Sequence, residues 1–498
     1  MNSKIISEII KIADEHPDKQ ALITDKFSVN YKQLLTQAND LADWLTQNKV
    51  MDVAVFLDNS LAWVIIDLAC VIADVRHIAL PAFFSNEQIK HIYAVSNPDL
   101  IITFDQSRIL DLGLKFSSIL KMPVLDVLIL KTESQQVSKQ RANGKLTFTS
   151  GTTSQPKGVC LDQDLIDNVT FNLKKRLEDS TINLHVGVLP YSTLLENIAG
   201  IYLPLIIGAS IYIKTSDELG FNGSSGLDIK QFISVLEKIK PDSFIIFPQI
   251  LLGLVTFTKM TGQRPFEPKF IAVGGSKCSP SLIQTARQQG WQVFEGYGLS
   301  EAASVISMNV PAQDKVGSVG KPLNDELVKI IDGEICINHN FFSGYLGEPT
   351  YSQHYLNTGD MGYIDEDGYL YVNGRKKNLI ITSYGRNISP EWLESEFSQI
   401  PDVAQCLIYG DAQPFCTAII VPPSKNIDLE KLDNHINQLN ETLPDYARIR
   451  SWFIATEAFS FSNGLLTANG RLKREKIATQ YERELNEIYE TQKISGVQ

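Results

Sequence analysis

The chain has 498 residues, of which 44% are hydrophobic and 20% charged, and its formal net charge is -12 at pH 7. This length is enough for roughly three ordinary domains, and the composition is that of a globular protein. The acidic balance argues against a general nucleic-acid or anionic-membrane surface, so positive charge that holds phosphate has to be concentrated in one place.

The N-terminal stretch and the cysteines favour a cytoplasmic protein. Residues 1–19 have the spacing of an amphipathic helix with acidic residues inside it, unlike a signal peptide. The longest apolar runs, 61–75 and 244–257, are broken by polar residues or proline, and we predict no transmembrane segment. Reduced thiols are favoured over disulfides or a zinc site, because no CxxC pair occurs among Cys70, Cys160, Cys278, Cys336, Cys406 and Cys416.

Short apolar runs alternate with longer helical patterns up to about residue 373. The runs at 53–57, 243–247 and 270–275 are typical of buried strands, and the alternation predicts an α/β domain with largely parallel sheets. The turn at 365–368 then predicts a hairpin, which is followed by a polar cluster at 375–377. We therefore predict a large multi-sheet domain over residues 1–376 and a second domain over residues 377–498.

The second domain has the signals of a small α+β lobe. Ser389 and Pro390 are good residues for starting a helix, and Glu391 and Trp392 continue it. An apolar, hairpin-like stretch follows at 403–421.

The stretch LTFTSGTTSQPKGVCL at 146–161 has the composition of a triphosphate-binding loop. Small residues let backbone amides approach phosphate, hydroxyl groups add donors, and lysine adds a mobile positive charge. A Walker loop is excluded because Pro156 takes the place of its second glycine and Gly158 that of its magnesium-binding hydroxyl. The residues that we assign to phosphate binding are Thr149, Ser150, Gly151, Thr152, Thr153 and Lys157.

A second polar turn, FEGYGLSEAAS, occupies residues 294–304. Tyr297 lies between glycines and can offer an aromatic face to a base. Ser300 supplies a donor, and Glu301 supplies a hard oxygen ligand for magnesium.

Taken together and in order, the motifs resemble those of the adenylate-forming superfamily, which includes acyl-CoA synthetases, peptide-synthetase adenylation domains and luciferases. The motif at 149–158 is similar to the phosphate loop of that family, and YGLSE at 297–301 is similar to its YGxTE motif. VGGS at 273–276, NTGD at 357–360 and YVNGRKKNLI at 371–380 follow the family pattern as well.

The resemblance implies a role for each matching residue. Lys157, Thr149 and Thr152 grip the departing phosphates, Glu301 binds magnesium, and Tyr297 is the platform for adenine. The remaining implied roles are the adenine pocket floor for Gly274, Gly275 and Ser276, ribose contacts for Asp360 and Arg375, the hinge for Lys377, and a thiol tunnel for Gly385.

The resemblance also implies a reaction in two halves. A carboxylate attacks the α-phosphate of ATP to give an acyl-adenylate and pyrophosphate, and a thiol or amine then displaces AMP. ATP, Mg²⁺ and CoA, or the phosphopantetheine of a carrier protein, are the implied cofactors. The small lobe is implied to be mobile and to rotate between the half-reactions.

The chain departs from the family near its C-terminus, in LLTANGRLKREKI at 465–477. Where the family has a lysine directly after the Asn-Gly pair, this chain has Arg471, and Lys473 follows two residues later. Arginine is a planar fork and not a compact charge. Three interpretations remain open: Arg471 bridges carboxylate and α-phosphate, Lys473 does, or the first half-reaction is impaired.

The substrate prediction depends on the segment 188–200, which resembles the acyl-pocket lining of the family and contains Tyr191 and Glu196. No aspartate occurs there to pair with an α-amino group, and a buried ammonium without a partner would be costly, so amino acids are disfavoured. The C-terminal motifs are most similar to the long-chain acyl-CoA synthetase branch. We predict a medium- or long-chain fatty acid as substrate. The alternatives are an acyl-carrier-protein or acyl-amide ligase and a degenerate adenylate-binding protein without activity.

Overall fold

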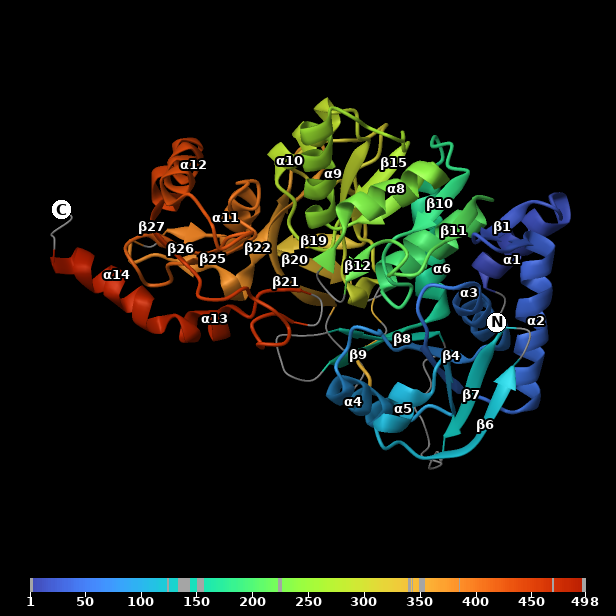
Figure 1. The fold of residues 1–498 in the computed structure, drawn as a ribbon. Coiled ribbons are helices and arrows are strands. Elements are labelled where there is room, and N and C mark those ends of the chain that lie inside the picture. The colour runs from blue at the N-terminus through green and yellow to red at the C-terminus, as the bar shows by residue number, and fades with distance from the viewer. Residues whose placement is uncertain are drawn as a thin grey trace.

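The structure, a computed structural model, describes residues 3–122, 125–132, 144–149, 156–222, 226–338, 342, 344–348, 354–384, 386–467 and 470–494. Its large body contains a nine-stranded, a seven-stranded and a four-stranded sheet, and a three-stranded sheet lies in a smaller C-terminal lobe beside it (Figure 1). The predicted fold class, a multi-sheet α/β domain followed by a small α+β domain, is confirmed.

The seven-stranded sheet has the order β6-β7-β5-β3-β4-β8-β9. Its four central strands, β5, β3, β4 and β8, are mutually parallel, and helices α3 and α4 carry the chain from β3 to β4 and from β4 to β5. The strands are β3 (Asp52–Phe56), β4 (Arg76–Ala79), β5 (Leu100–Thr103), β6 (Phe116–Met122), β7 (Val127–Thr132), β8 (Lys145–Thr149) and β9 (Lys157–Leu161). The helices are α3 (Leu61–Ala73), α4 (Asn86–Ser96) and α5 (Ser107–Asp111).

The nine-stranded sheet has the order β18-β17-β16-β15-β14-β10-β11-β1-β2 and is parallel from β1 to β16. Its strands are β1 (Gln20–Ile23), β2 (Ser28–Asn30), β10 (Leu184–Gly187), β11 (Ser210–Ile213), β14 (Ser243–Ile246), β15 (Phe270–Val273), β16 (Val293–Tyr297), β17 (Ser307–Met308) and β18 (Lys321–Pro322). Nearby elements are α1 (Lys4–Glu15), α2 (Tyr31–Gln47), α6 (Gln163–Arg176), the π-helix η1 (Glu196–Tyr202), α7 (Leu203–Ile206), β12 (Phe221–Asn222), β13 (Gly226–Leu227), α8 (Ile229–Ile239), α9 (Pro248–Thr261), α10 (Pro280–Gln288) and the 3₁₀ helix η2 (Ser300–Ala302).

The four-stranded sheet is antiparallel and ends in the hairpin predicted at 365–368. Its strands are β19 (Val328–Ile331), β20 (Glu334–Asn338), β21 (Tyr355–Ile364) and β22 (Leu370–Arg375). The register of β21 and β22 places Asp360 directly opposite Arg375. Side chains at such a pair lie on one face of the sheet, so this hairpin holds the two predicted ribose residues together.

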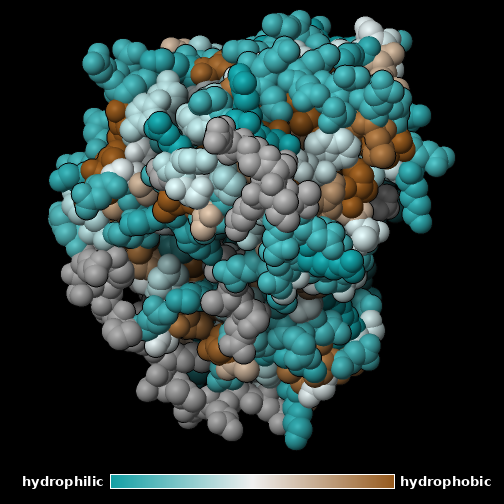
Figure 2. All heavy atoms as spheres, turned by 90° about the vertical axis from the view of Figure 1, so that its left-hand side faces the viewer, coloured by the Kyte–Doolittle hydropathy of each residue, from teal (hydrophilic) through white to brown (hydrophobic). Residues whose placement is uncertain are grey.

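The C-terminal lobe starts after the short helix η4 (Lys376–Asn378), and its core is made of its own residues. Ser389 caps the predicted helix by accepting the Trp392 amide, and the predicted hairpin at 403–421 forms β25 and β26. The elements are β23 (Ile380–Ile381), β24 (Asn387–Ile388), α11 (Pro390–Phe397), β25 (Gln405–Tyr409), β26 (Cys416–Val421), α12 (Leu429–Thr442), η5 (Asp445–Ala447), β27 (Ile449–Ile454), α13 (Arg474–Gln480) and α14 (Glu482–Ile494). The face of the molecule on this side is mainly hydrophilic, with small separate apolar patches (Figure 2).

The apolar patterns of the sequence become core elements. Helix α1 buries Ile5, Ile9 and Ile12 on one face, as its amphipathic spacing predicts, and α3 is buried along most of its length. All six cysteines are free and buried. Among the described residues, no helix is both long and apolar enough to cross a membrane.

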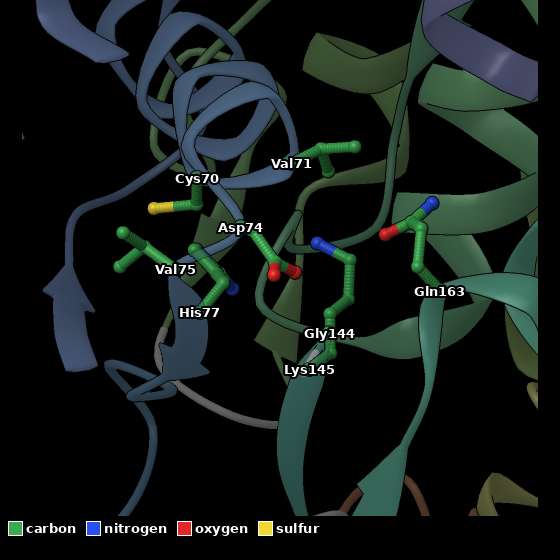
Figure 3. A pocket seen from close by; sticks show the side chains of 8 residues that line it. All are labelled: Cys70, Val71, Asp74, Val75, His77, Gly144, Lys145 and Gln163. Carbon is green, nitrogen blue, oxygen red and sulfur yellow. The ribbon is translucent and has the colours of Figure 1, made fainter. Parts of the chain in front are cut away.

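An ion pair is enclosed between α3 and the seven-stranded sheet. The ammonium of Lys145, at the start of β8, bonds the carboxylate of Asp67 on α3, and Asn197 of η1 donates to the other carboxylate oxygen at 2.9 Å. Both charged side chains are buried. His77 of β4 lies 3.7 Å from the same carboxylate. Lys145 and His77 enter from neighbouring strands below α3, around a cavity of about 10 Å³ that is no larger than a water molecule (Figure 3).

His77 makes the stability of the protein sensitive to acid. Burial lowers its pKa from 6.5 to about 3, and the nearby charge of Lys145 acts in the same direction. Between these values the unfolded chain binds the proton and the folded chain does not, so the free energy of unfolding falls as pH falls from 6.5 toward 3. The loss from this one group approaches about 1.4 kcal/mol per pH unit.

Denaturant unfolding at several pH values in this range, on wild type and on His77→Asn, measures that loss. We expect a shallower decline in the variant, since asparagine takes up no proton. Equal declines would contradict the account of His77.

Candidate active site

The predicted motifs meet at one edge of the large body, where parallel strands end. The glycines at 274 and 275 follow β15, and Tyr297 ends the neighbouring strand β16. Because the carboxyl ends of parallel strands lie at the same edge of the sheet, these turns are adjacent. Thr149 and Lys157 are paired at the ends of β8 and β9. The predicted phosphate residues Ser150, Gly151, Thr152 and Thr153 lie outside the described residues, as does the side chain of Thr149.

Tyr297, Asp360 and Arg375 form a connected group. The Tyr297 hydroxyl donates to Asp360 Oδ2 at 2.6 Å, and Arg375 Nε lies 2.8 Å from Asp360 Oδ1. Arg375 also donates to the carbonyl of Thr358 at 3.2 Å. Burial raises the pKa of the Asp360 carboxyl, while the charge of Arg375 acts against that shift. The group therefore presents an aromatic ring beside an oriented carboxylate, which can accept ribose hydroxyl groups.

The turn after β15 needs its glycines for steric reasons. Gly275 has a φ of +83°, and a Cβ there would lie 2.8 Å from the ring of Phe247. A Cβ on Gly274 would lie 3.1 Å from the carbonyl of Gly296. Ser276, which follows, is exposed. Both glycines are therefore required by close packing, Gly275 against the Phe247 ring and Gly274 against the backbone that precedes Tyr297.

Arg471 reaches this turn from the C-terminal lobe, and Lys473 does not. Arg471 Nη2 donates to the carbonyl of Gly275 at 3.3 Å, and the charges that act on its guanidinium are those of Arg375, Asp360 and Glu301. The Lys473 amide instead bonds the carbonyl of Leu465 at 2.8 Å as α13 begins. The charge that acts on its side chain is that of Lys476, within the lobe. The geometry therefore places the Arg471 guanidinium beside the residues predicted to contact adenine and ribose.

A second cluster, which we call the phosphate-side cluster after the role predicted for Lys157, consists of Lys157, Glu301, Tyr345 and Glu348. Lys157 Nζ pairs with Glu348 Oε1 at 3.1 Å and lies 5.1 Å from the centre of the Tyr345 ring. The Tyr345 hydroxyl donates to Glu301 Oε1 at 2.9 Å. Ser300 begins the short helix η2 that carries Glu301. Lys157 and Glu301 belong to the predicted motifs. Tyr345 and Glu348 do not, because their segment GYLGE has no composition typical of a phosphate site.

The two lobes also touch through side chains that the motifs did not indicate. Ser279, the cap of α10, donates to Glu396 at 3.1 Å and accepts from Gln399 at 2.7 Å. The Ser281 hydroxyl donates to Gln399 Oε1 at 2.7 Å. Burial raises the pKa of Glu396, and its hydrogen bond from Ser279 opposes the shift. These contacts hold α11 against α10 in the arrangement that brings Arg471 to Gly275.

The segment between the lobes contains the predicted hinge and tunnel residues. Lys377 lies in η4, directly after β22, where burial and the charge of Arg375 lower its pKa. Its neighbour Lys376 pairs with Glu334 at 2.9 Å, which anchors η4 to β20. Gly385 lies outside the described residues.

The two predicted acyl-pocket residues are both enclosed. Glu196, the first residue of η1, accepts the Leu189 amide at 3.2 Å and lies 3.2 Å from Nε2 of His185. Burial raises the pKa of Glu196, and the hydrogen bond with His185 opposes the shift. The Tyr191 ring packs edge-on against Trp63, with 5.6 Å between ring centres. In this conformation both side chains are packed inside the protein core.

Comparison with family models gives two matches that together cover most of the chain. The model described as AMP-binding enzyme matches residues 10–346, and the model described as AMP-binding enzyme C-terminal domain matches residues 377–493.

Curated relatives include ligases for different acids. A long-chain-fatty-acid–CoA ligase of Mycobacterium bovis is 28% identical over 246 residues, which cover 43% of this chain and only 41% of that protein. Long-chain-fatty-acid–CoA ligase 5 of Rattus norvegicus is 23% identical, with 93% of this chain and 84% of the relative covered. The 2-succinylbenzoate–CoA ligase of Bacillus subtilis is 27% identical, with 79% and 82% covered. The chain thus spans less than half of the Mycobacterium protein.

Solved structures with the same fold come from enzymes of this kind. The o-succinylbenzoate CoA synthetase of Bacillus subtilis, in complex with its acyl-adenylate intermediate, superposes with a TM-score of 0.74 at 21% identity, over 94% of this chain and 97% of that one. An anthranilate CoA ligase in complex with anthranoyl-AMP gives a TM-score of 0.76 at 17% identity, over 96% of each chain. At this identity the likeness establishes the fold.

Proposed function

Since the chain belongs to the AMP-binding enzyme family, we propose that it is an AMP-forming acid–thiol ligase, which activates a carboxylic acid with ATP and transfers the acyl group to CoA. The membership bears out the resemblance drawn from the sequence motifs. The observation that carries the proposal is the convergence of Tyr297, Asp360 and Arg375 from the large body with Arg471 from the small lobe. These groups offer contacts for a base, a ribose and an α-phosphate at one place.

In the proposed first half-reaction, the protein holds two anions close together. Asp360 accepts the ribose hydroxyl groups, and Tyr297 stacks on the adenine, which fixes the α-phosphorus near Arg471. The Arg471 fork donates to the α-phosphate and to the attacking carboxylate, and this lowers the repulsion between them in the transition state. Positioning of this kind makes a protein nucleophile unnecessary.

The phosphate-side cluster suits the two remaining parts of the bound Mg²⁺–ATP, the departing pyrophosphate and the Mg²⁺ ion. Lys157 would exchange Glu348 for the departing pyrophosphate, since both side chains of this ion pair are about half exposed to solvent. Glu301 would hold Mg²⁺: Tyr345 bonds one of its oxygens, and the second carboxylate oxygen offers the hard donor that this ion prefers. When bound, the ion would neutralise charge on the phosphates.

The proposed substrate is a medium- or long-chain fatty acid. The absence of an aspartate at 188–200 speaks against an amino-acid substrate, and fatty-acid ligases are among the relatives. A relative that acts on 2-succinylbenzoate matches a similar share of the chain, so an aryl acid is the competing class. CoA is the proposed thiol, because the curated relatives compared above carry CoA ligase in their names. A cytoplasmic location is part of the same proposal.

Carboxylate-dependent exchange of labelled pyrophosphate into ATP tests this function. Octanoate, palmitate, 2-succinylbenzoate, benzoate and an α-amino acid would be compared, each with Mg²⁺ and without CoA. We expect exchange with the fatty acids, and acyl-CoA formation once CoA is added. Faster exchange with the aryl or amino acids would contradict the fatty-acid assignment. ATP binding without exchange for any acid would indicate the adenylate-binding protein without activity.

A further inference from the structure

Tyr345 lies on a short segment that is paired with the phosphate hairpin. The Cys160 amide of β9 donates to the carbonyl of Gly344 at 3.0 Å, and the Leu346 amide donates to the carbonyl of Gly158 at 2.8 Å. Tyr345 itself stands opposite Val159. Backbone pairing on both sides fixes the place from which its side chain extends.

The side chain of Tyr345 contacts two charged groups with two different parts. Its hydroxyl donates to the Glu301 carboxylate at 2.9 Å, and its ring faces the Lys157 ammonium, which lies 5.1 Å from the ring centre. The two charges belong to separate segments, one at the start of β9 and the other on η2. Tyr345 therefore connects the cation that faces the phosphates with the carboxylate that would hold the metal.

Glu301 needs such a support because its own segment is short. Helix η2 has 3 residues, and Ala303 and Ser304 after it have φ angles of 50° and 84°. One turn of 3₁₀ helix restrains a long glutamate side chain poorly. The Tyr345 hydroxyl bonds one oxygen and leaves the other lone pairs of the carboxylate available to a cation.

We propose that Tyr345 is a positioning residue, which holds Glu301 ready for Mg²⁺ and Lys157 ready for the departing phosphates. This inference rests on the proposed function. It predicts that loss of the hydroxyl weakens the effect of Mg²⁺ on ATP binding. Loss of the ring should in addition weaken the binding of the ATP phosphates. Adenosine recognition does not depend on Tyr345, because it is assigned to Tyr297, Asp360 and Arg375.

Calorimetric measurement of the affinity for ATP at several Mg²⁺ concentrations, without the carboxylic acid substrate, tests the inference independently of catalytic turnover. Tyr345→Phe removes only the hydroxyl. We expect the Mg²⁺ concentration that gives half of its maximal effect on ATP binding to rise on the order of tenfold, as for other residues that hydrogen-bond to metal ligands. Tyr345→Leu also removes the ring, and should weaken ATP binding without Mg²⁺ by roughly threefold more than Tyr345→Phe does. AMP binding should be unchanged in both variants, which shows that they are folded.

Tyr363→Phe is the matched control, since Tyr363 lies on β21 and stacks on Tyr371, away from the cluster. If Tyr345→Phe requires the same Mg²⁺ concentration for ATP binding as wild type and Tyr363→Phe, the inference is wrong while the proposed function stands. If Tyr345→Leu does not fold, the Phe variant decides alone. Wild type that binds ATP without any effect of Mg²⁺ would contradict both the inference and the proposed function.

Discussion

Replacement of Arg471 by alanine is expected to slow carboxylate-dependent ATP–pyrophosphate exchange on the order of 100- to 1,000-fold, because one preorganised donor to the developing charge is lost. The Arg471 side chain extends from the C-terminal lobe to the turn after β15, at 3.3 Å from the carbonyl of Gly275. AMP binding should change much less, since Asp360 and Tyr297 remain. Exchange rates at saturating ATP and acid measure the effect.

Lys473→Ala is the matched variant for this experiment. It removes a positive charge two residues away, whose neighbouring charge is Lys476 of the same lobe, so exchange should stay close to the wild-type rate. Arg471→Lys should recover part of the lost rate, because a lysine keeps the charge without the planar fork. Normal exchange in Arg471→Ala together with lost exchange in Lys473→Ala would overturn the assignment of Arg471.

Lys145→Met is expected to lower the free energy of unfolding by ~3–5 kcal/mol, because it leaves the Asp67 carboxylate buried without its charge partner. Asp67 and Lys145 are both enclosed between α3 and the sheet, and the Asn197 amide cannot neutralise the charge. His77 lies 3.7 Å from the same carboxylate, but its burial disfavours the protonated form that could replace Lys145. Strand β8 ends at Thr149, the first residue of the predicted phosphate loop, so we expect weaker ATP binding to accompany the loss of stability. Denaturant unfolding followed by circular dichroism measures the change.

The double variant Lys145→Met/Asp67→Asn separates the charge effect from a packing effect. Asparagine keeps the shape of the carboxylate and its hydrogen bond with Asn197 but carries no charge, so most of the lost stability should return. A double variant as unstable as Lys145→Met alone would show that packing, and not the unpaired charge, causes the loss.

The order of motifs predicted the fold class, because several motifs follow strands that their apolar runs reveal, as the turn at 274–276 follows β15. The motif at 357–360 instead lies within strand β21. The pairing of Asp360 with Arg375 was harder to predict from the sequence. A regular hairpin counted back from the turn would place Asp360 opposite Gly374. A bulge between Met361 and Gly362 shifts the register by one residue and brings Arg375 into place.

Contacts between distant segments could not be predicted from the motifs. Tyr345 reaches Glu301 because a short stretch after β20 pairs with β9, and a stretch this short has no strand periodicity. The choice between Arg471 and Lys473 depended on how the C-terminal lobe is seated against the large body, where Ser279 bonds Glu396 and Ser281 bonds Gln399. Polar side chains at such an interface resemble any solvated surface in the sequence.

An isotope-labelling experiment that follows the carboxylate oxygens tests most directly the central claim that the acid is activated through an acyl-adenylate. Wild-type protein would be incubated with ATP, Mg²⁺, CoA and palmitate labelled with ¹⁸O in both carboxylate oxygens, and the AMP analysed by mass spectrometry. If the carboxylate attacks the α-phosphate and CoA then attacks the acyl carbon, each AMP carries one ¹⁸O atom. Unlabelled AMP, or ADP with labelled phosphate, would contradict the claim.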